Sequence, residues 1–397
     1  QNFRGVFMKI FRRFICFSLS VMMLMTAFSM FASAEDAAAL KFGSDGKFQI
    51  MVFADIQDDA PVKETTITLM TEALEKAKPD LVVYLGDNTI GAGMEDTIKE
   101  IVAPTVAAGV PFAFVYGNHD PEFGEKEELY SYYKNAGGDL CLTTDAAPDT
   151  YGFGNSNLTI KSSDGKKTAF NLWFIDSGSS NPDKEVGGYD YVHEDQVSWM
   201  KSTAEKLRAE NGGEYVPSML FQHIIMPEVY EILYPKLPFN IGKDYTMNGV
   251  SYFPVPFFTR HTGIILEPCS PSFNSVGQFD ACVETGVIAT FHGHDHVNDF
   301  TTNYKGVHIV NIPTVGGQAY SDAISRGVGV ITLDENDLTA FDYKTLYMFD
   351  MALEEDSEIL ECEDARSATY YKFVRLFRKM LNGIHNIFVT KNYEYDR

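Results

Sequence analysis

Short apolar runs that end in polar residues recur along this chain of 397 residues. An apolar run of four to eight residues is typical of a strand that is buried on both faces. Each run therefore predicts a buried strand that delivers polar side chains at its carboxyl end. The first three are residues 48–54 before Asp55, residues 81–85 before Gly86-Asp87-Asn88, and residues 112–116 before Gly117-Asn118-His119-Asp120.

The segments between these runs have helical patterns. Residues 63–77 repeat apolar side chains at helical spacing until Pro79, and residues 95–108 do so until Gly109. Strands that alternate with helices favour an α/β fold, in which ligands gather beyond the carboxyl ends of the strands. Further strands are predicted at residues 171–175, 218–222, 287–291, 307–312 and 328–333, and long loops at 177–190 and 236–262.

Two of the later strands also end in histidines. His223 follows residues 218–222, and Gly293-His294-Asp295-His296 follows residues 287–291. Alternate residues of an extended segment point the same way, so His294 and His296 are placed to act together. Carboxylate, amide and imidazole groups that converge from several strands are the donors needed by a pair of divalent metal ions.

Taken in order, these cassettes resemble the calcineurin-like metallophosphoesterase superfamily. The pattern of that family is Asp-x-His, Gly-Asp, Gly-Asn-His-Asp/Glu, a His after a strand, and Gly-His-x-His, and the resemblance spans residues 47 to about 335. It implies a four-layer α/β/β/α sandwich, with two mixed sheets face to face and helices outside. The segments Lys78-Pro79-Asp80-Leu81, Gly86-Asp87-Asn88 and residues 293–300 look closest to purple-acid-phosphatase-like proteins of the short plant and fungal type.

The resemblance also implies a ligand set for two divalent ions, which would be Mn, Fe or Zn. Asp87 would bridge the two ions. The first ion would take Asp55, Gln57, Asp87 and His296, and the second Asp87, Asn118, His223 and His294.

Catalytic roles follow from the same resemblance. His119 would reach the leaving-group oxygen as a general acid or electrostatic stabiliser, and Asp120 would orient its ring. Asn88 and His119 would contact the substrate phosphate. Asp299 is expected to cap or orient the loop that carries His296.

The chain departs from the family pattern at two positions. Gln57 stands where the family has a histidine, and a neutral amide oxygen is a weaker donor that favours harder ions such as Mn²⁺ or Mg²⁺. Asp58, Asp59 or a water is the alternative ligand there. Ile90 stands where coloured purple acid phosphatases have a tyrosine, so no purple colour is expected.

The expected activity is hydrolysis of phosphomonoesters, on a small phosphorylated substrate or a phosphoprotein. Phosphodiesters, including cyclic nucleotides, are the alternative within catalysis, because the metal cassettes are shared across the superfamily. A secreted binding protein with a degenerate metal site is the alternative outside catalysis, and Gln57 motivates it.

The N-terminus has the pattern of an export signal that begins at Met8. Three basic residues precede an apolar run, residues 14–31, and then Ala32-Ser33-Ala34. We expect residues 1–34 to be a signal peptide, the mature chain to start at about residue 35, and the body to be secreted or extracytoplasmic. An uncleaved membrane anchor is the alternative, since the run approaches the ~18–20 apolar residues that span a bilayer. In such an oxidising setting the cysteines at 141, 269, 282 and 362 would form zero to two disulfides.

The predicted catalytic domain covers residues 45–335, and a C-terminal extension covers 336–397. The extension has an acidic segment, then a basic amphipathic helix with Phe373, Phe377 and Met380 beside Lys372 and Lys379. This helix is expected to dock on the body, with weak contact to an anionic membrane surface as the alternative. The net charge of the whole chain is −23, so we expect no nucleic-acid partner.

Overall fold

Two β-sheets organise the chain in the computed structural model, which describes residues 39–233, 245–247, 250–252 and 261–388. The chain divides into two units, Gln1–Leu40 and Lys41–Arg397, and the described residues lie almost wholly in the second. The predicted signal peptide and most of the predicted loop at 236–262 fall outside the described residues.

The first sheet has five strands, in the order β14-β13-β1-β2-β3. Its parallel part is built from the first three predicted runs, which form β1 (Lys47–Phe53), β2 (Leu81–Leu85) and β3 (Phe112–Val115). The crossovers are the predicted helices, α2 (Glu64–Ala77) and α3 (Met94–Ala107). Two antiparallel strands, β13 (Gly327–Asp334) and β14 (Asp337–Tyr347), complete the sheet beside β1.

The second sheet has seven strands, in the order β4-β5-β6-β10-β12-β11-β9. Four neighbouring strands are parallel, and the antiparallel strands β4, β11 and β9 flank them. Their bounds are β4 Ser156–Lys161, β5 Thr168–Phe174, β6 Ser218–Phe221, β9 His261–Ile264, β10 Val287–His292, β11 Asp299–Tyr304 and β12 Val307–Asn311. A separate pair, β7 (Tyr245–Met247) and β8 (Val250–Tyr252), forms a small hairpin.

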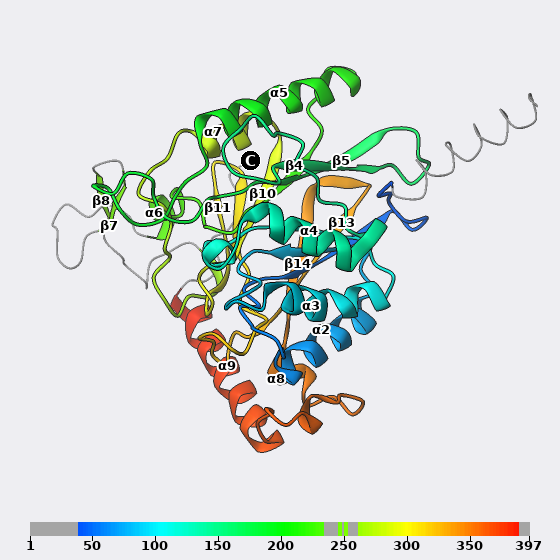
Figure 1. The fold of residues 1–397 in the computed structure, drawn as a ribbon, viewed down its shortest axis with the longest axis vertical. Coiled ribbons are helices and arrows are strands. Elements are labelled where there is room, and N and C mark those ends of the chain that lie inside the picture. The colour runs from blue at the N-terminus through cyan, green and yellow to red at the C-terminus, as the bar shows by residue number, and fades with distance from the viewer. Residues whose placement is uncertain (1–38, 234–244, 248–249, 253–260, 389–397) are drawn as a thin grey trace, which may run out of the picture. The chain divides into compact units, whose positions relative to one another are not determined.

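The sheets lie between two layers of helices, so the predicted four-layer sandwich is confirmed (Figure 1). Phe291 of β10 packs against Phe341 of β14 with the ring centroids 5.7 Å apart, which joins the sheets face to face. The outer face of the first sheet is covered by α2, α3 and α4 (Lys126–Gly137). The outer face of the second is covered by α5 (Glu194–Glu210), α6 (Val229–Leu233) and α7 (Gln278–Glu284). Cys141 is buried in the core beneath the helices of the first sheet, and Cys269 and Cys282 are buried beneath those of the second. None of the four described cysteines forms a disulfide.

The C-terminal segment is joined closely to this body. Because β14 pairs with β13, the boundary predicted at residue 335 falls inside a β-hairpin. After α8 (Met348–Met351), the helix α9 (Ala368–Phe388) packs against the body through Tyr371 and Val374, as expected for a docked helix.

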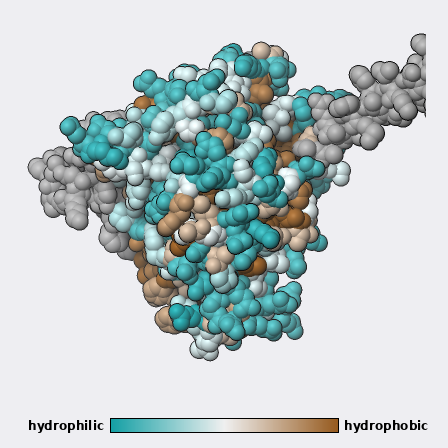
Figure 2. All heavy atoms as spheres, in the orientation of Figure 1, coloured by the Kyte–Doolittle hydropathy of each residue, from teal (hydrophilic) through white to brown (hydrophobic). Residues whose placement is uncertain are grey.

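The outer side of α9 leaves apolar side chains in solvent, with Phe373 63% and Leu376 67% exposed. Apolar atoms gather at the lower left of Figure 2, where α9 lies in Figure 1. Two of its basic residues are paired, Arg375 with Asp350 and Arg378 with Asp299. Membrane contact through this helix stays a prediction. Among the described residues, no helix has both the length and the apolar composition needed to cross a bilayer.

Candidate metal centre

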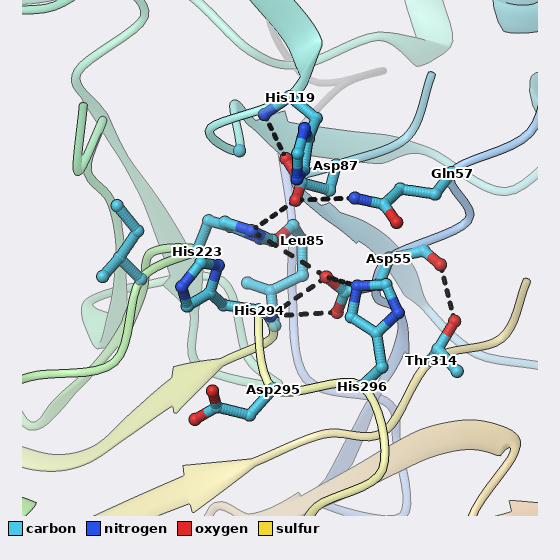
Figure 3. Close-up of polar contacts among 12 residues, drawn as sticks. Asp55, Gln57, Leu85, Asp87, His119, His223, His294, Asp295, His296 and Thr314 are labelled. Atoms are coloured by element: carbon cyan, nitrogen blue, oxygen red, sulfur yellow. Dashed lines mark hydrogen bonds and ion pairs between the residues drawn. The ribbon is translucent and has the colours of Figure 1, made fainter. Parts of the chain in front are cut away.

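The predicted ligands meet where the carboxyl ends of the two sheets' strands come together (Figure 3). Asp55 and Gln57 follow β1, and Asp87 follows β2, both in the first sheet. His223 follows β6 in the second sheet, and His294 and His296 follow β10. Because the two sheets pack face to face, residues as far apart in the sequence as Asp55 and His296, 241 positions, lie in one cluster.

The backbone at four of these ligands has a left-handed conformation that non-glycine residues rarely adopt. The φ angles are 51° at Asp55, 39° at Gln57, 49° at Asp87 and 72° at His294. Each such residue costs on the order of 1–3 kcal/mol, and residues of this kind cluster at functional sites. Two backbone hydrogen bonds join the turn after β1 to the turn after β2. The N–H of Gln57 donates to the carbonyl oxygen of Asp87 over 2.8 Å, and the N–H of Asp55 donates to that of Gly86 over 3.2 Å.

Two glycines allow the carboxylates to sit this close to neighbouring backbone. A Cβ at Gly117 would lie 2.0 Å from Oδ1 of Asp87, and a Cβ at Gly293 would lie 2.4 Å from Oδ2 of Asp55. The Gly-Asn-His and Gly-His-Asp-His motifs therefore begin with glycine because a ligand carboxylate occupies the space of a side chain.

The ligand atoms form two overlapping groups. One contains Asp87, His223 and His294, and the other contains Asp55, Asp87 and His296, with all atoms of a group within 4.8 Å of one another. Asp87 belongs to both groups. Nε2 of His223 lies 3.0 Å from Oδ2 of Asp87, and Nε2 of His296 lies 3.4 Å from Oδ1 of Asp55. This is the division of carboxylate and imidazole ligands that the resemblance implies.

Burial and neighbouring charges shift the pKa values of the ionisable groups in this cluster. Burial would lower the pKa of His223, but the carboxylates of Asp87 and Asp55 raise it to about 10. Burial and then the charge of His223 lower the pKa of His294 to about 3, so His294 is neutral, the form that binds a metal. Burial also raises the pKa of Asp55, against the opposing effect of His296. Protonated His223 thus offsets part of the negative charge of the two buried carboxylates, and it would have to lose its proton to bind a metal.

The two predicted amide ligands, Asn118 and Gln57, differ in whether an oxygen is free to bind a metal. Oδ1 of Asn118 and Nε2 of His294 are buried and have no hydrogen-bond partner in the described part of the chain, as expected for atoms reserved for an ion. Gln57 directs Nε2 to Oδ2 of Asp87 over 3.0 Å (Figure 3). Its amide would have to turn by half a rotation to present oxygen, and the two orientations are nearly isosteric.

The alternative ligands at this corner have other roles. Asp58 accepts hydrogen bonds from the backbone N–H groups of Asp59 and Lys63. The carboxylate of Asp59 faces Gly91 and Gly93, where a Cβ would lie 2.6 and 2.7 Å from its oxygens. Neither carboxylate belongs to a ligand group found among the described residues.

His119 lies at the rim of the cluster, with its side chain 41% exposed. Its backbone N–H donates to Oδ1 of Asp87 over 2.7 Å, which ties the β3 loop to the shared carboxylate. The ring contacts Glu122, with Nδ1 2.8 Å from Oε1. The prediction that Asp120 orients this ring is therefore wrong.

Asp120 instead holds the loops behind the ligands. It begins a short 3₁₀ turn that directs its carboxylate inward, where it accepts hydrogen bonds from the backbone N–H groups of Asn88, Thr89 and Gly117 at 2.8–3.1 Å. Burial and the charge of Asp87 raise its pKa to about 6. The side chain of Asn88 is buried, and neither of its amide atoms has a partner among the described residues.

Aromatic residues that the motifs do not mark complete the site. The Tyr320 ring stacks on His296 at 4.0 Å, and its carbonyl oxygen accepts from Nδ1 of His296 over 2.7 Å. Tyr189 meets His294 edge-on at 4.3 Å. Both tyrosines come from loops without a strong pattern, and the only signal in the sequence was that Tyr189 lies inside the predicted long loop at 177–190.

Comparisons with known proteins agree with this geometry. The model of the calcineurin-like phosphoesterase family matches residues 48–298. "Probable inactive purple acid phosphatase 29" of Arabidopsis thaliana is 28% identical over 81% of this chain and 86% of its own length. "Phosphatase DCR2" of Saccharomyces cerevisiae is 29% identical over 66% of this chain and 46% of its own length.

A solved structure, the purple acid phosphatase PPD1 from yellow lupin seeds, is 12% identical, with a TM-score of 0.38 over 82% of this chain and 57% of that one. The match to the family model covers more than half of the chain and includes the strands that carry the ligands. This chain belongs to the calcineurin-like phosphoesterase family.

Proposed function

We propose that this protein hydrolyses phosphate monoesters at a site that holds two divalent metal ions. The observation that carries the proposal is the pair of buried ligand groups that share Asp87. A shared carboxylate between two sets of imidazole and carboxylate donors suits two ions a few ångströms apart. Unpartnered buried atoms on Asn118 and His294 support the same reading.

The chain's own residues would divide the work as follows. Asp55, Gln57, Asp87 and His296 would hold the first ion, and Asp87, Asn118, His223 and His294 would hold the second. A pair of bound divalent ions supplies an activated water and stabilises negative charge on the phosphoryl oxygens. Mn, Fe and Zn all suit these donors.

His119 would act on the leaving group. Its exposed ring projects from the rim of the cluster, and its backbone is fixed to Asp87. With Nδ1 directed to Glu122, Nε2 is left to give a proton to the departing oxygen. Asn88, whose buried amide has no partner among the described residues, would donate to a phosphoryl oxygen.

Substrate preference tests the proposal. The expected result is a kcat/KM at least 10-fold higher on an aryl phosphate monoester than on the matching diester.

His119→Ala should lower kcat about 10²-fold or more with metal content unchanged, because it removes the proton donor and no ligand. A preference for the diester would replace the monoester proposal with phosphodiester hydrolysis, and an unchanged kcat would refute the role of His119.

A non-catalytic binding protein is the second candidate, and Gln57 is the observation that favours it. A neutral amide in place of imidazole weakens one ion's ligand set. Metal analysis separates the candidates, because a purified chain that retains no metal after loading with Mn²⁺, Zn²⁺ or Fe²⁺, and hydrolyses neither ester, would be the binding protein.

A further inference from the structure

Arg378 is a buried cation of the C-terminal helix α9. Its side chain is 4% exposed, and Nη2 lies 2.7 Å from Oδ2 of Asp299, which is 5% exposed. Tyr347 donates to the same carboxylate and accepts from Nη2 of Arg378, and Thr345 donates to Oδ1 over 3.0 Å. The carboxylate of Asp299 thus takes its partners from the C-terminal part of the chain, and the predicted support of the His296 loop by Asp299 stays a prediction.

The same guanidinium reaches a second segment. Nη1 of Arg378 donates to the carbonyl oxygen of Ile324 over 3.3 Å. Ile324 lies in the loop between β12 and β13, four residues after Tyr320. Arg378 thus joins the start of β11, where Asp299 lies, to the loop that carries Tyr320.

These are the two segments that hold His296. Asp299 comes three residues after His296 in the chain. On the other side, Tyr320 accepts a hydrogen bond from the His296 ring and stacks on it with an interplanar angle of 2°. His223 is supported differently, by a bond from Nδ1 to the carbonyl oxygen of Leu85, at the end of a central strand.

We propose that Arg378 is a positioning residue for the metal centre. It fixes β11 and the Tyr320 loop to each other, so that Nε2 of His296 stays directed at the ligand group of Asp55 and Asp87. The C-terminal helix is then part of the metal site, and its loss affects the ion held by His296 more than the ion held by His223 and His294. The inference rests on the proposed two-ion centre.

A charge-neutral double variant tests this. Arg378→Gln with Asp299→Asn removes both charges and leaves no unpaired buried ion, which would unfold the protein for another reason. Titration of the full metal-free chain with Mn²⁺ by calorimetry is expected to show two equivalents in the unchanged chain. In the variant, one equivalent should bind about 10- to 100-fold more weakly, the usual effect of losing support behind a ligand, and the other should stay within about twofold.

The matched control is Arg375→Gln, which breaks the more exposed pair with Asp350 on the same helix. It should leave both equivalents unchanged. His296→Ala marks which equivalent belongs to the first ligand group. The proposal is overturned if the double variant binds both equivalents as the unchanged chain does, if both weaken equally, or if Arg375→Gln has the same effect.

If circular dichroism shows that the double variant does not fold, a second variant still tests the proposal. Arg378→Lys keeps a cation beside Asp299 but lacks the fork that reaches Ile324, so one equivalent should weaken about 3- to 10-fold. Unchanged affinities in this variant overturn the proposal. If the unchanged chain binds two equivalents but hydrolyses no ester, the proposed function fails alone. If it hydrolyses esters and neither variant shifts one equivalent selectively, the positioning role fails alone.

Discussion

Gln57 lies where the family motif carries a histidine, and its amide contacts the carboxylate shared by both ligand groups. Its side chain is buried, and its backbone has the same left-handed conformation as Asp55 and Asp87. The backbone of this turn therefore matches that of the other predicted ligands, and the residue type is what departs from the family pattern. An amide oxygen binds borderline metals more weakly than imidazole does.

We expect Gln57→His to tighten binding of one metal equivalent about 10-fold, because imidazole replaces a weak donor at a prepared position. Calorimetric titration of the metal-free chain with Zn²⁺ measures this directly. Gln49→His, at a part-buried position on β1 away from the ligand groups, serves as the control and should change neither equivalent. An unaltered affinity in the Gln57 variant would mean that residue 57 does not coordinate.

At this scale, the sequence predicted which carboxylates and histidines lie together, but it did not predict the residues that contact them. The carboxylates and histidines stand in short motifs with fixed neighbours, and the structure brings them together. Tyr320 contacts His296 across a gap of 24 residues, a contact that exists only after folding. Asp120 shows the same limit, because the direction of its carboxylate depends on a 3₁₀ turn that the motif does not encode.

At the scale of elements, the central strands were predictable and several flanking strands were not. β1, β2 and β3 are buried on both faces, so their sequences are continuous apolar runs. β14 and β4 lie at the edges of their sheets, where most of their residues are exposed or only partly buried, and this leaves too few apolar side chains to mark them. β11, with the sequence DFTTNY, pairs through its backbone and carries mostly polar side chains.

The start of α2 depends on a residue from the far end of the chain. Asp364 accepts from the backbone N–H of Thr65 over 3.0 Å and from its hydroxyl over 2.7 Å, while the N-cap residue Lys63 makes no side-chain cap. Arg326 donates to Thr66 over 2.9 Å and to the carbonyl oxygen of Val315 over 3.0 Å. The acidic C-terminal segment thus stabilises the helix that follows the first ligand turn.

Asp364→Ala should lower the free energy of unfolding by about 1–2 kcal/mol, the usual effect of losing a side-chain cap. Urea denaturation followed by circular dichroism measures the change. Asp356→Ala, an exposed acid in the same segment, should change it by less than about 0.5 kcal/mol and controls for the removal of charge. Equal destabilisation by both variants would attribute the effect to net charge and not to the cap.

At the scale of the whole molecule, the acidic balance makes the metal centre a stabilising element. The chain has 55 acidic and 32 basic residues, and Asp55, Asp87, Asp120 and Asp295 are buried around one cluster. Burial raises the pKa of both Asp120 and Asp295, and neighbouring negative charges raise it further, from Asp87 at Asp120 and from Glu267 and Asp55 at Asp295. His223 is the cation that offsets Asp87 most directly in the absence of metal.

Removal of metal should therefore lower the melting temperature of the protein, and Mn²⁺ should restore it. An ion that binds only the folded state at about 100 times its dissociation constant adds about 2.7 kcal/mol of stability. With an unfolding entropy of about 2.1 cal/mol/K per residue, a body of this size shifts by a little over ~1 °C per kcal/mol, so the expected rise is about 3–5 °C. Scanning calorimetry of the chelator-treated chain with and without Mn²⁺ measures it, with Asp87→Ala as the control, because that variant lacks the carboxylate common to both ligand groups. An equal rise in Asp87→Ala would place the stabilising ions elsewhere on the acidic surface.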